Sequence, residues 1–166
     1  MYELEGLRRD HEAAVLEFEL ANRMYFARSI NDRGDEFFED FPQRHSELVA
    51  EQENGLVACY VLVGQDEKIV GRFNLYDLTE QTANVGYRVA ERVAGRGVAT
   101  AGLRDLCRTA GDELGLQKLT AIVGNENGAS RRVLEKIGFV VVGPTEIAGR
   151  EASAYELTLA KPGPLT

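Results

Sequence analysis

The sequence predicts a mixed α/β fold, in which helices flank a central, mostly antiparallel sheet of about six to seven strands. Three apolar runs of strand length follow one another between residues 57 and 89, and the short turns between them favour antiparallel neighbours. Beyond residue 97, helical and strand patterns alternate, which is typical of a sheet covered by helices. A chain of 166 residues with 44% hydrophobic and 28% charged residues suits one domain, residues 1–166, with a sizeable core.

The first third of the chain predicts a short strand and two helices. Residues 2–7 have a strand pattern, and residues 13–25 place most of their apolar side chains on one broad helical face. Residues 29–34 are polar and end in glycine, so they predict a loop. Asp35 is suited to cap a second helix, which Pro42 is able to interrupt.

The remaining elements follow from the same patterns. Turns are predicted at residues 66–67 and 79–81, and an amphipathic helix at residues 98–114, which Gly115 ends. A second, shorter helix is predicted at residues 129–137. The predicted strands are residues 57–63, 69–76, 83–89, 119–123, 139–142 and 153–159. Residues 161–166, with Pro162 and Pro164, predict a flexible tail.

Glycines and arginines gather where a predicted strand turns into the helix that begins at residue 98. The segment reads Arg92-Val93-Ala94-Gly95-Arg96-Gly97-Val98-Ala99-Thr100. A helix N-terminus carries unpaired N–H groups and a partial positive charge, and glycine lets a bulky anion approach the main chain. The segment therefore predicts a phosphate or pyrophosphate site, with an ordinary glycine-containing turn as the alternative.

Two common nucleotide-binding motifs do not fit this segment. A P-loop needs lysine and then serine or threonine after its last glycine, whereas Val98 follows Gly97. A dinucleotide motif needs glycine where Thr100 stands, and an acidic residue about twenty positions further on, near Gln117 and Lys118. A nucleotide-binding protein of another kind remains a competing hypothesis.

Two blocks of sequence, in this order, resemble those of the GNAT N-acetyltransferases. Arg92-x-x-Gly95-x-Gly97-x-Ala99 resembles their acetyl-CoA pyrophosphate loop. Residues 127–139, which begin Asn127-Gly128-Ala129-Ser130 and end Gly138-Phe139, resemble their second signature. The serine form, with Glu-Lys-x-Gly-Phe, is most similar to the ribosomal-protein N-terminal acetyltransferase branch. The resemblance covers residues 69–159 and implies the GNAT fold with splayed central strands.

The resemblance also implies that acetyl-CoA is the co-substrate and which residues bind it. Backbone groups of the splayed strand would contact the pantetheine arm, and Gly86 would mark a bulge in that strand or simply allow close packing. Arg131 and Arg132 are further candidates to offset the charge of CoA. The implied binding residues are Tyr87, Arg88, Val89, Arg92, Gly95, Arg96, Gly97, Val98, Ala99, Thr100, Asn127 and Ser130.

Ser130 is the general acid that the resemblance implies. Many GNAT enzymes carry a tyrosine four residues further on, where this chain has Leu134. A thiol has a pKa of about 8.5, so the leaving thiolate needs little help at neutral pH. The alternative is that Asn127 caps the helix and that Ser130 is only an early helical residue.

Glu146 is the candidate general base, since it lies near the position where a glutamate serves in the ribosomal-protein branch. A solvated loop carboxylate is the alternative. The strand at residues 121–123 lacks the glutamate of many family members. Deprotonating a lysine-like amine at pH 7 costs about 4–5 kcal/mol, against about 1 kcal/mol for an α-amine. A weak base therefore favours a protein N-terminus or a small-molecule amine as the acceptor.

The family position of the first helix and the splayed strand implies where the acceptor binds. Tyr25 and Phe26 follow the first helix, and Asn74 and Tyr76 end the strand beside the splay. These four residues are the candidate substrate-binding residues. The alternative is that the aromatic members belong to the core.

Composition narrows the remaining classes. A net charge of −8 argues against nucleic acid as a partner, and no apolar run approaches the roughly 20 residues of a membrane span. The N-terminus lacks the features of a signal peptide, and Cys59 and Cys107 resemble free core thiols, so we expect a cytoplasmic protein. His11 and His45 lie far apart without ligand spacing, so no metal is expected.

The sequence thus predicts an N-acetyltransferase that moves an acetyl group from acetyl-CoA to a primary amine by direct attack in a ternary complex. The protein is expected to be a monomer or a homodimer. The alternative keeps the fold but not the activity: a non-catalytic module that binds CoA or acetyl-CoA as a sensor or an assembly part.

Overall fold

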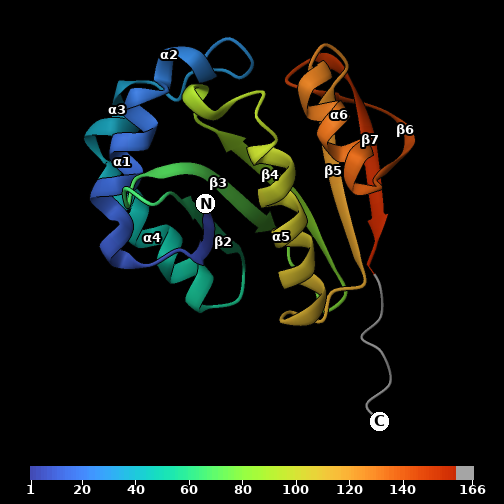
Figure 1. The fold of residues 1–166 in the computed structure, drawn as a ribbon, viewed down its shortest axis with the longest axis horizontal. Helices are drawn as coiled ribbons and strands as arrows, with labels where there is room; N and C mark the ends of the chain where they lie inside the picture. The colour runs from blue at the N-terminus through green and yellow to red at the C-terminus, as the bar shows by residue number, and fades with distance from the viewer. Residues whose placement is uncertain (160–166) are drawn as a thin grey trace.

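The computed structural model describes residues 1–159, which form a seven-stranded sheet in the order β1-β2-β3-β4-β5-β7-β6 with helices on its faces (Figure 1). Only β4 and β5 pair in parallel, so the predicted mixed, mostly antiparallel sheet is confirmed. The strands are β1 (Glu3–Gly6), β2 (Ala58–Val63), β3 (Ile69–Tyr76), β4 (Thr82–Val89), β5 (Lys118–Gly124), β6 (Val140–Ile147) and β7 (Arg150–Thr158). The tail predicted at residues 161–166 lies outside the described residues.

Along the chain, the helices lie between the strands. Short 3-10 turns, η1 (Arg9–His11) and η2 (Glu91–Val93), precede two of them. The helices are α1 (Glu12–Ala21), α2 (Arg23–Phe26), α3 (Asp35–Glu39), α4 (Phe41–Glu53), α5 (Val98–Asp112) and α6 (Gly128–Ile137). Gly115, with φ 67°, lies in the turn after α5, as expected of a helix stop.

The helix predicted at residues 13–25 is broken at Asn22. The buried Asn22 amide donates to the carbonyl of Phe18 (2.9 Å), and its oxygen accepts from the backbone N–H of Glu91 (3.0 Å). A polar side chain that bonds the backbone in this way competes with the helical ladder. Asn22 therefore joins the junction of α1 and α2 to the segment that leads into the glycine loop.

The capping role predicted for Asp35 is wrong. Gly34, with φ 85°, occupies the cap position without a side-chain bond, and Asp35 is the first helical residue. Its carboxylate instead accepts a hydrogen bond from the Arg23 guanidinium at 2.8 Å. The predicted interruption near Pro42 is confirmed, because Asp40 separates α3 from α4 and Pro42 occupies the first turn of α4, where its missing N–H does no harm.

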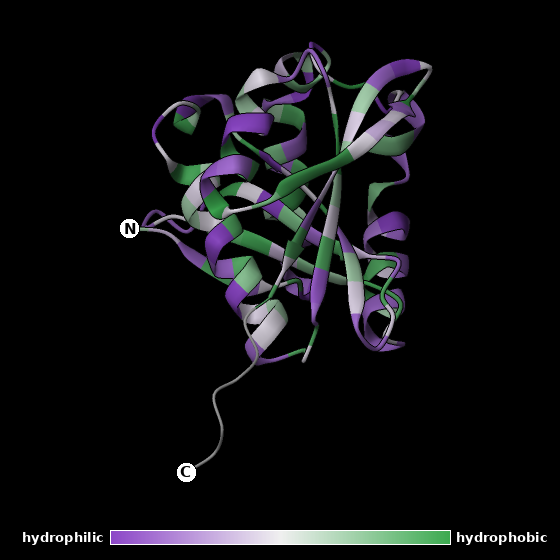
Figure 2. Cartoon of the chain, turned by 90° about the vertical axis from the view of Figure 1, so that its right-hand side faces the viewer, coloured by the Kyte–Doolittle hydropathy of each residue, from purple (hydrophilic) through white to green (hydrophobic). Residues whose placement is uncertain are grey.

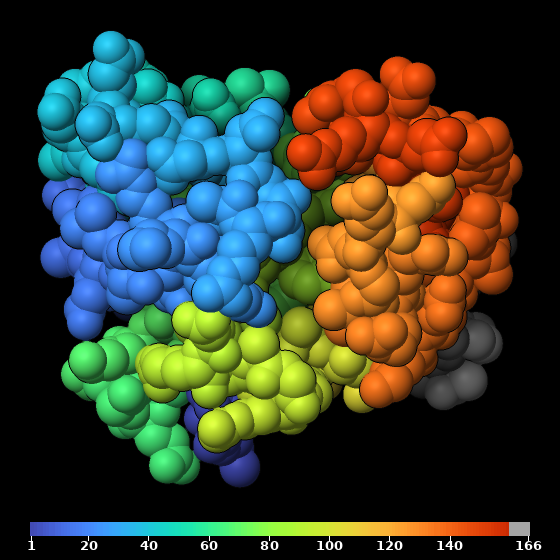
Figure 3. Space-filling model, turned by 90° about the horizontal axis from the view of Figure 1, so that it is seen from above, coloured from blue at the N-terminus to red at the C-terminus, as the bar shows by residue number. Residues whose placement is uncertain are grey.

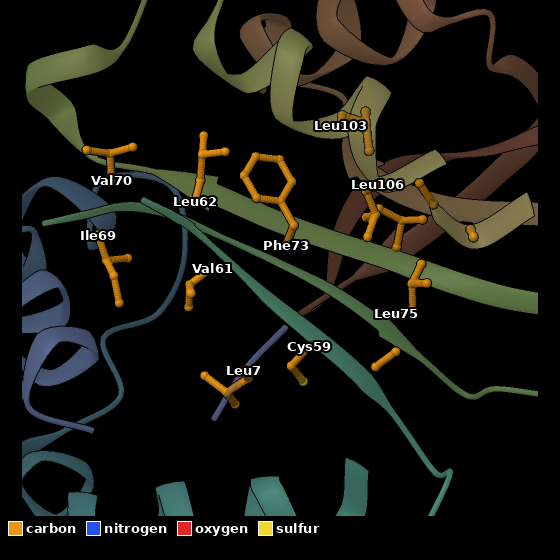
Figure 4. Close-up of a cluster of buried hydrophobic side chains, with 14 of the residues drawn as sticks. Leu7, Cys59, Val61, Leu62, Ile69, Val70, Phe73, Leu75, Leu103 and Leu106 are labelled. Atoms are coloured by element: carbon orange, nitrogen blue, oxygen red, sulfur yellow. The ribbon is translucent and has the colours of Figure 1, made fainter. Parts of the chain in front are cut away.

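The core has two layers, one on each face of the central strands. Figure 4 shows Leu62 and Phe73 directed toward Leu103 and Leu106 of α5, whereas Val61 points to the opposite face. That second face is covered by α1 and α4, and Figure 1 shows α1 to α4 grouped on this side. Hydrophobic residues concentrate in the strands and hydrophilic residues on the outward helix surfaces (Figure 2). The sheet is therefore fixed from both sides.

The sheet opens between β4 and β5, which confirms the predicted splay. The two strands pair only over Thr82–Asn84 and Lys118–Thr120, and their later residues have no partner across this gap. At the last pair, the Thr120 hydroxyl donates to the Asn84 amide oxygen, and the Asn84 amide nitrogen donates to Asp77 at 2.9 Å. These bonds lie at the vertex of the opening.

The predicted bulge at Gly86 is not present, because β3 and β4 stay in register from Gly71↔Val89 to Tyr76↔Asn84. Gly86 lies opposite Asn74, and a Cβ on it would lie 3.4 Å from the Tyr76 ring. The glycine therefore allows close packing of Tyr76, which is the alternative that the sequence left open.

The last two strands are longer than predicted and form one hairpin. β6 extends to Ile147, and Ala148 (φ 51°) and Gly149 (φ 77°) make the turn into β7. Two consecutive positive φ angles match the right-handed twist of paired strands. Glu146 consequently lies in a strand, opposite Glu151, and not in the predicted loop.

Candidate active site

The glycine loop between η2 and α5 is shaped like a shallow anion cradle. Gly95 (φ 74°) and Gly97 (φ 78°) both adopt left-handed conformations, and a Cβ on either would meet no atom within 4 Å. Val93 and Val98 are buried and anchor the two ends of the loop. The first-turn N–H groups of α5, which follow at Val98, Ala99 and Thr100, have no acceptor within the helix. The loop is thus open above and lined with backbone donors.

The four arginines that are candidates to offset the charge of CoA differ in what they contact. Arg92 and Arg96 are exposed, and within residues 1–159 neither takes part in an ion pair, nor does Arg132. Arg131 instead donates to the Tyr155 hydroxyl (3.3 Å) and to the carbonyl of Asn125 (3.2 Å). The structure therefore leaves Arg92, Arg96 and Arg132 available for an anion and engages Arg131 internally.

The side chain of Arg88 also points away from the glycine loop. Its guanidinium donates to Glu19 of α1 at 2.6 Å, and Arg72 of β3 donates to the same carboxylate at 2.8 Å. Glu19 is 2% exposed, and burial lowers the pKa of Arg88 to about 10, so Arg88 stays charged at neutral pH. This network, which links α1 to the splayed strand, was not predicted from the sequence. Only the backbone of Arg88 is left to face the opening.

Tyr87 and Ser130 meet across the opening between the two halves of the sheet. The Tyr87 hydroxyl of β4 lies 2.9 Å from Ser130 Oγ of α6. The backbone N–H of Ser130 donates to the Asn127 side chain at 3.2 Å, so Asn127 caps α6 as one of the sequence alternatives proposed. Burial raises the pKa of Tyr87. The sequence predicts Tyr87 only as a CoA-binding residue, and the contact of its hydroxyl with Ser130 was not predicted.

The four predicted acceptor residues differ in how exposed they are. Phe26 is 8% exposed and packs on Phe18 with ring centroids 5.5 Å apart, so it belongs to the core. Tyr25 is half-buried, and Tyr76 is 39% exposed. The Asn74 amide oxygen is buried and has no hydrogen-bond partner within residues 1–159. Tyr76 is therefore the most accessible of the four.

Figure 3 shows a hollow in the surface of the molecule. The segment after α1, coloured blue, lies on one side of it, and α6 and the β6–β7 hairpin, coloured orange and red, lie on the other. Green strand residues form its floor, and the yellow-green glycine loop borders it. Glu146 is exposed in β6 and makes no ion pair or side-chain hydrogen bond within residues 1–159. A separate cavity of about 670 Å³ lies at the other end of the sheet, near Tyr60, Leu78 and Leu116, away from these residues.

Residues 3–140 match the family described as the acetyltransferase (GNAT) domain. The chain belongs to the GNAT acetyltransferase family. The assignment made from the two sequence blocks is thereby confirmed. No helix in this GNAT chain is long and apolar enough to cross a membrane, as far as residues 1–159 describe it.

Similar proteins point to the same branch of the GNAT family. YdaF of Bacillus subtilis (strain 168), provisionally named a ribosomal N-acetyltransferase, is 38% identical over 82 residues, which cover 47% of this chain. The match spans only 44% of the length of YdaF.

Two solved structures extend the similarity over nearly the whole GNAT chain. A ribosomal-protein-S5-alanine acetyltransferase from Vibrio fischeri superposes with a TM-score of 0.88 at 20% identity, over 95% of this chain and 92% of that one. RimJ of Mycobacterium smegmatis, solved with CoA-disulfide, superposes with a TM-score of 0.83 at 26% identity, over 95% of this chain and 81% of that one. The predicted similarity to the ribosomal-protein branch is confirmed.

Proposed function

We propose that this protein transfers the acetyl group of acetyl-CoA to a primary amine by direct attack while both substrates are bound. The observation that carries this proposal is that three features occur together where the central strands of the sheet separate. The strands β4 and β5 separate there, the open glycine loop begins α5 beside them, and Ser130 faces the gap from α6. GNAT membership supports the same reading.

The chain offers a fitting set of groups for acetyl-CoA. The first-turn N–H groups of α5 suit the pyrophosphate, and we expect the exposed Arg92 and Arg96 to offset its charge. At Tyr87, Arg88 and Val89, β4 pairs with β3 but has no strand partner on the side that faces β5, and the backbone groups on that side suit the pantetheine amides. The co-substrate supplies an acetyl group that is activated as a thioester.

Ser130 and Glu146 are the proposed proton donor and acceptor. Ser130 Oγ is positioned between β4 and α6 and is only half-buried. Glu146 is exposed on the β6–β7 hairpin, in a strand that holds its backbone in place. An exposed carboxylate is a weak base, and an α-amine needs only a weak or water-relayed base because its pKa is about 8.

The acceptor that best suits these groups is a protein N-terminal α-amine or a small-molecule amine. The relatives named for ribosomal-protein acetylation favour the N-terminus. Residues 25–34 and Tyr76 would shape the acceptor side of the hollow. We further propose that the domain works in the cytoplasm as one unit, without a metal or nucleic acid, and as a monomer or homodimer.

The test is a panel of acceptors incubated with acetyl-CoA, with thiol release as the readout. Peptides that begin with different residues, polyamines, aminoglycosides and free amino acids make up the panel. We expect release that depends on the enzyme and on one class of amine, and calorimetric binding of CoA but not of ATP or NAD. Binding of CoA without release from any acceptor would instead favour a non-catalytic CoA-binding module.

A further inference from the structure

We propose that Tyr87 is a positioning residue that directs the Ser130 hydroxyl proton toward the thioester sulfur, an inference that rests on the proposed function. The two oxygens lie 2.9 Å apart, and they belong to the two halves of the molecule that separate at the splay. The Tyr87 phenol therefore contacts the proposed acid directly, in a chain that has Leu134 where many GNAT enzymes carry a tyrosine.

The direction of this hydrogen bond follows from acidity and burial. A phenol is a stronger acid than an aliphatic alcohol, so Tyr87 is the better donor of the pair. Burial raises the pKa of Tyr87, which keeps its proton in place at neutral pH. When Tyr87 donates to Ser130 Oγ, the proton of Ser130 must point away from Tyr87. We expect it to point into the gap between β4 and β5, which α6 faces.

Both partners are held rigidly enough for such aiming. The Tyr87 ring stacks on Phe73, with an interplanar angle of 8° and centroids 5.6 Å apart. Phe73 is fully buried against Gly102 of α5, where a Cβ would overlap its ring. On the other side, the Asn127 cap fixes the backbone of Ser130. The helix that follows the glycine loop thus packs on Phe73, and Phe73 in turn stacks on the residue that orients the acid.

The proposed proton movement balances. The amine nitrogen forms the new C–N bond, the C–S bond breaks with its electron pair remaining on sulfur, and Ser130 gives that sulfur a proton. Glu146 accepts the proton lost by the amine nitrogen, directly or through water, and Ser130 regains a proton from solvent. Tyr87 keeps its own proton throughout, and its contribution is to orient and polarise the hydroxyl of Ser130.

The first experiment compares Tyr87→Phe with Tyr60→Phe, which makes the same change in a half-buried strand tyrosine at the other end of the sheet. Phenylalanine keeps the stack on Phe73 and removes only the hydroxyl. We expect Tyr87→Phe to lower kcat by about tenfold or more while CoA affinity, measured by calorimetry, changes by less than about threefold. Tyr60→Phe should change neither quantity.

The second experiment tests whether Tyr87 acts through Ser130. If it does, the double variant Tyr87→Phe/Ser130→Ala should have the kcat of Ser130→Ala alone, within about twofold. A double variant that loses the product of the two single effects would show that Tyr87 acts independently, which would overturn the inference.

The third measurement does not depend on turnover. A Ser130 proton directed at sulfur stabilises the thiolate form of bound CoA. The affinity for CoA should therefore rise as the pH is raised from about 7 to about 9, whereas the affinity for desulfo-CoA, which has no thiol, should not rise in this way. This rise should shrink in Tyr87→Phe and in Ser130→Ala. Coincident pH profiles, or an unchanged kcat in Tyr87→Phe, would overturn the role of Tyr87 and leave the proposed function intact. Absence of thiol release from the unsubstituted protein would overturn both.

Discussion

Gly97, with φ 78°, is the residue just before α5, and the space above it is open, so a side chain there would project into the proposed phosphate cradle. Gly97→Glu should therefore weaken CoA binding by about 100-fold or more, because the carboxylate fills the cradle and repels the pyrophosphate. Calorimetry with CoA is the measurement.

Gly55→Glu is a matched control for Gly97→Glu. Gly55 has φ 75° and open space around its Cβ position, but it lies in the turn after α4. Both variants strain a left-handed residue by about 1–2 kcal/mol. Only the Gly97 variant should lose CoA, and equal CoA affinities in the two variants would remove the cradle assignment.

Glu19 is a buried carboxylate shared by two arginines, Arg72 and Arg88. Glu19→Ala should lower the free energy of unfolding by about 3–5 kcal/mol, since it leaves two buried cations without a counter-ion. Glu17→Ala, two residues away on α1, removes only an exposed partner of Lys68 and should cost less than about 0.5 kcal/mol. Urea unfolding of both variants measures these losses, and similar decreases in the free energy of unfolding would contradict the role of Glu19.

At the scale of elements, the start of η1 is closed by a histidine whose Nδ1 accepts a hydrogen bond, which requires the neutral ring. His11 is 7% exposed, its Nδ1 accepts from the backbone N–H of Arg8 at 3.0 Å, and Glu5 lies 3.6 Å from its Nε2. Burial is the main reason that the pKa of His11 is lowered, and Arg8 adds to this effect. Protonation of His11 would remove the Nδ1 acceptor and place a positive charge on a buried side chain.

The sign of the pH effect follows from that lowered pKa. The unfolded chain, with a histidine pKa of about 6.5, binds the proton more readily than the folded chain. Stability is therefore complete above about pH 6.5 and declines as the pH falls toward the folded pKa. Urea unfolding near pH 7.5 and pH 5.5 should show a larger loss for the unsubstituted protein than for His11→Gln. Equal losses would show that His11 does not contribute.

Elements with a strong period and clear breakers were predictable from sequence. β3 was predicted with both ends correct, and α5 begins at Val98 as expected, because Gly97 precedes an uninterrupted helical period. The break at Asn22 was not predictable, since it depends on Glu91, which is 69 residues away. The β6–β7 hairpin was underestimated because its turn, Ala148-Gly149, is a weak turn signal and because Glu146 and Pro144 are uncommon in strands.

The candidate site shows the same division. The glycine loop is local, so its sequence predicted the left-handed glycines at the helix start. The contact between Tyr87 and Ser130 joins residues 43 apart, and the inward direction of Tyr87 follows only from the stack on Phe73. Likewise, nothing in the sequence near Arg88 indicates that its side chain turns to Glu19, on the opposite face from the glycine loop.

At the scale of the whole molecule, the two halves of the sheet are joined at a narrow vertex. β4 and β5 share three residue pairs, and the hydroxyl of Thr120 on one strand bonds the Asn84 amide on the other. Asn84 is held in turn by Asp77. The bonds at this vertex should fix the angle between the strands, and with it the distance between the glycine loop and α6.

Thr120→Val keeps the shape of the side chain and removes the bond at the vertex. We expect the free energy of unfolding to fall by about 1–3 kcal/mol, because the Asn84 oxygen is left without its donor. CoA affinity should fall several-fold as well, since the ligand would have to restore the angle between the halves. Thr158→Val, an exposed change at the end of β7, should alter neither. A Thr120 variant that loses stability but keeps full CoA affinity would show that the opening is set by packing alone.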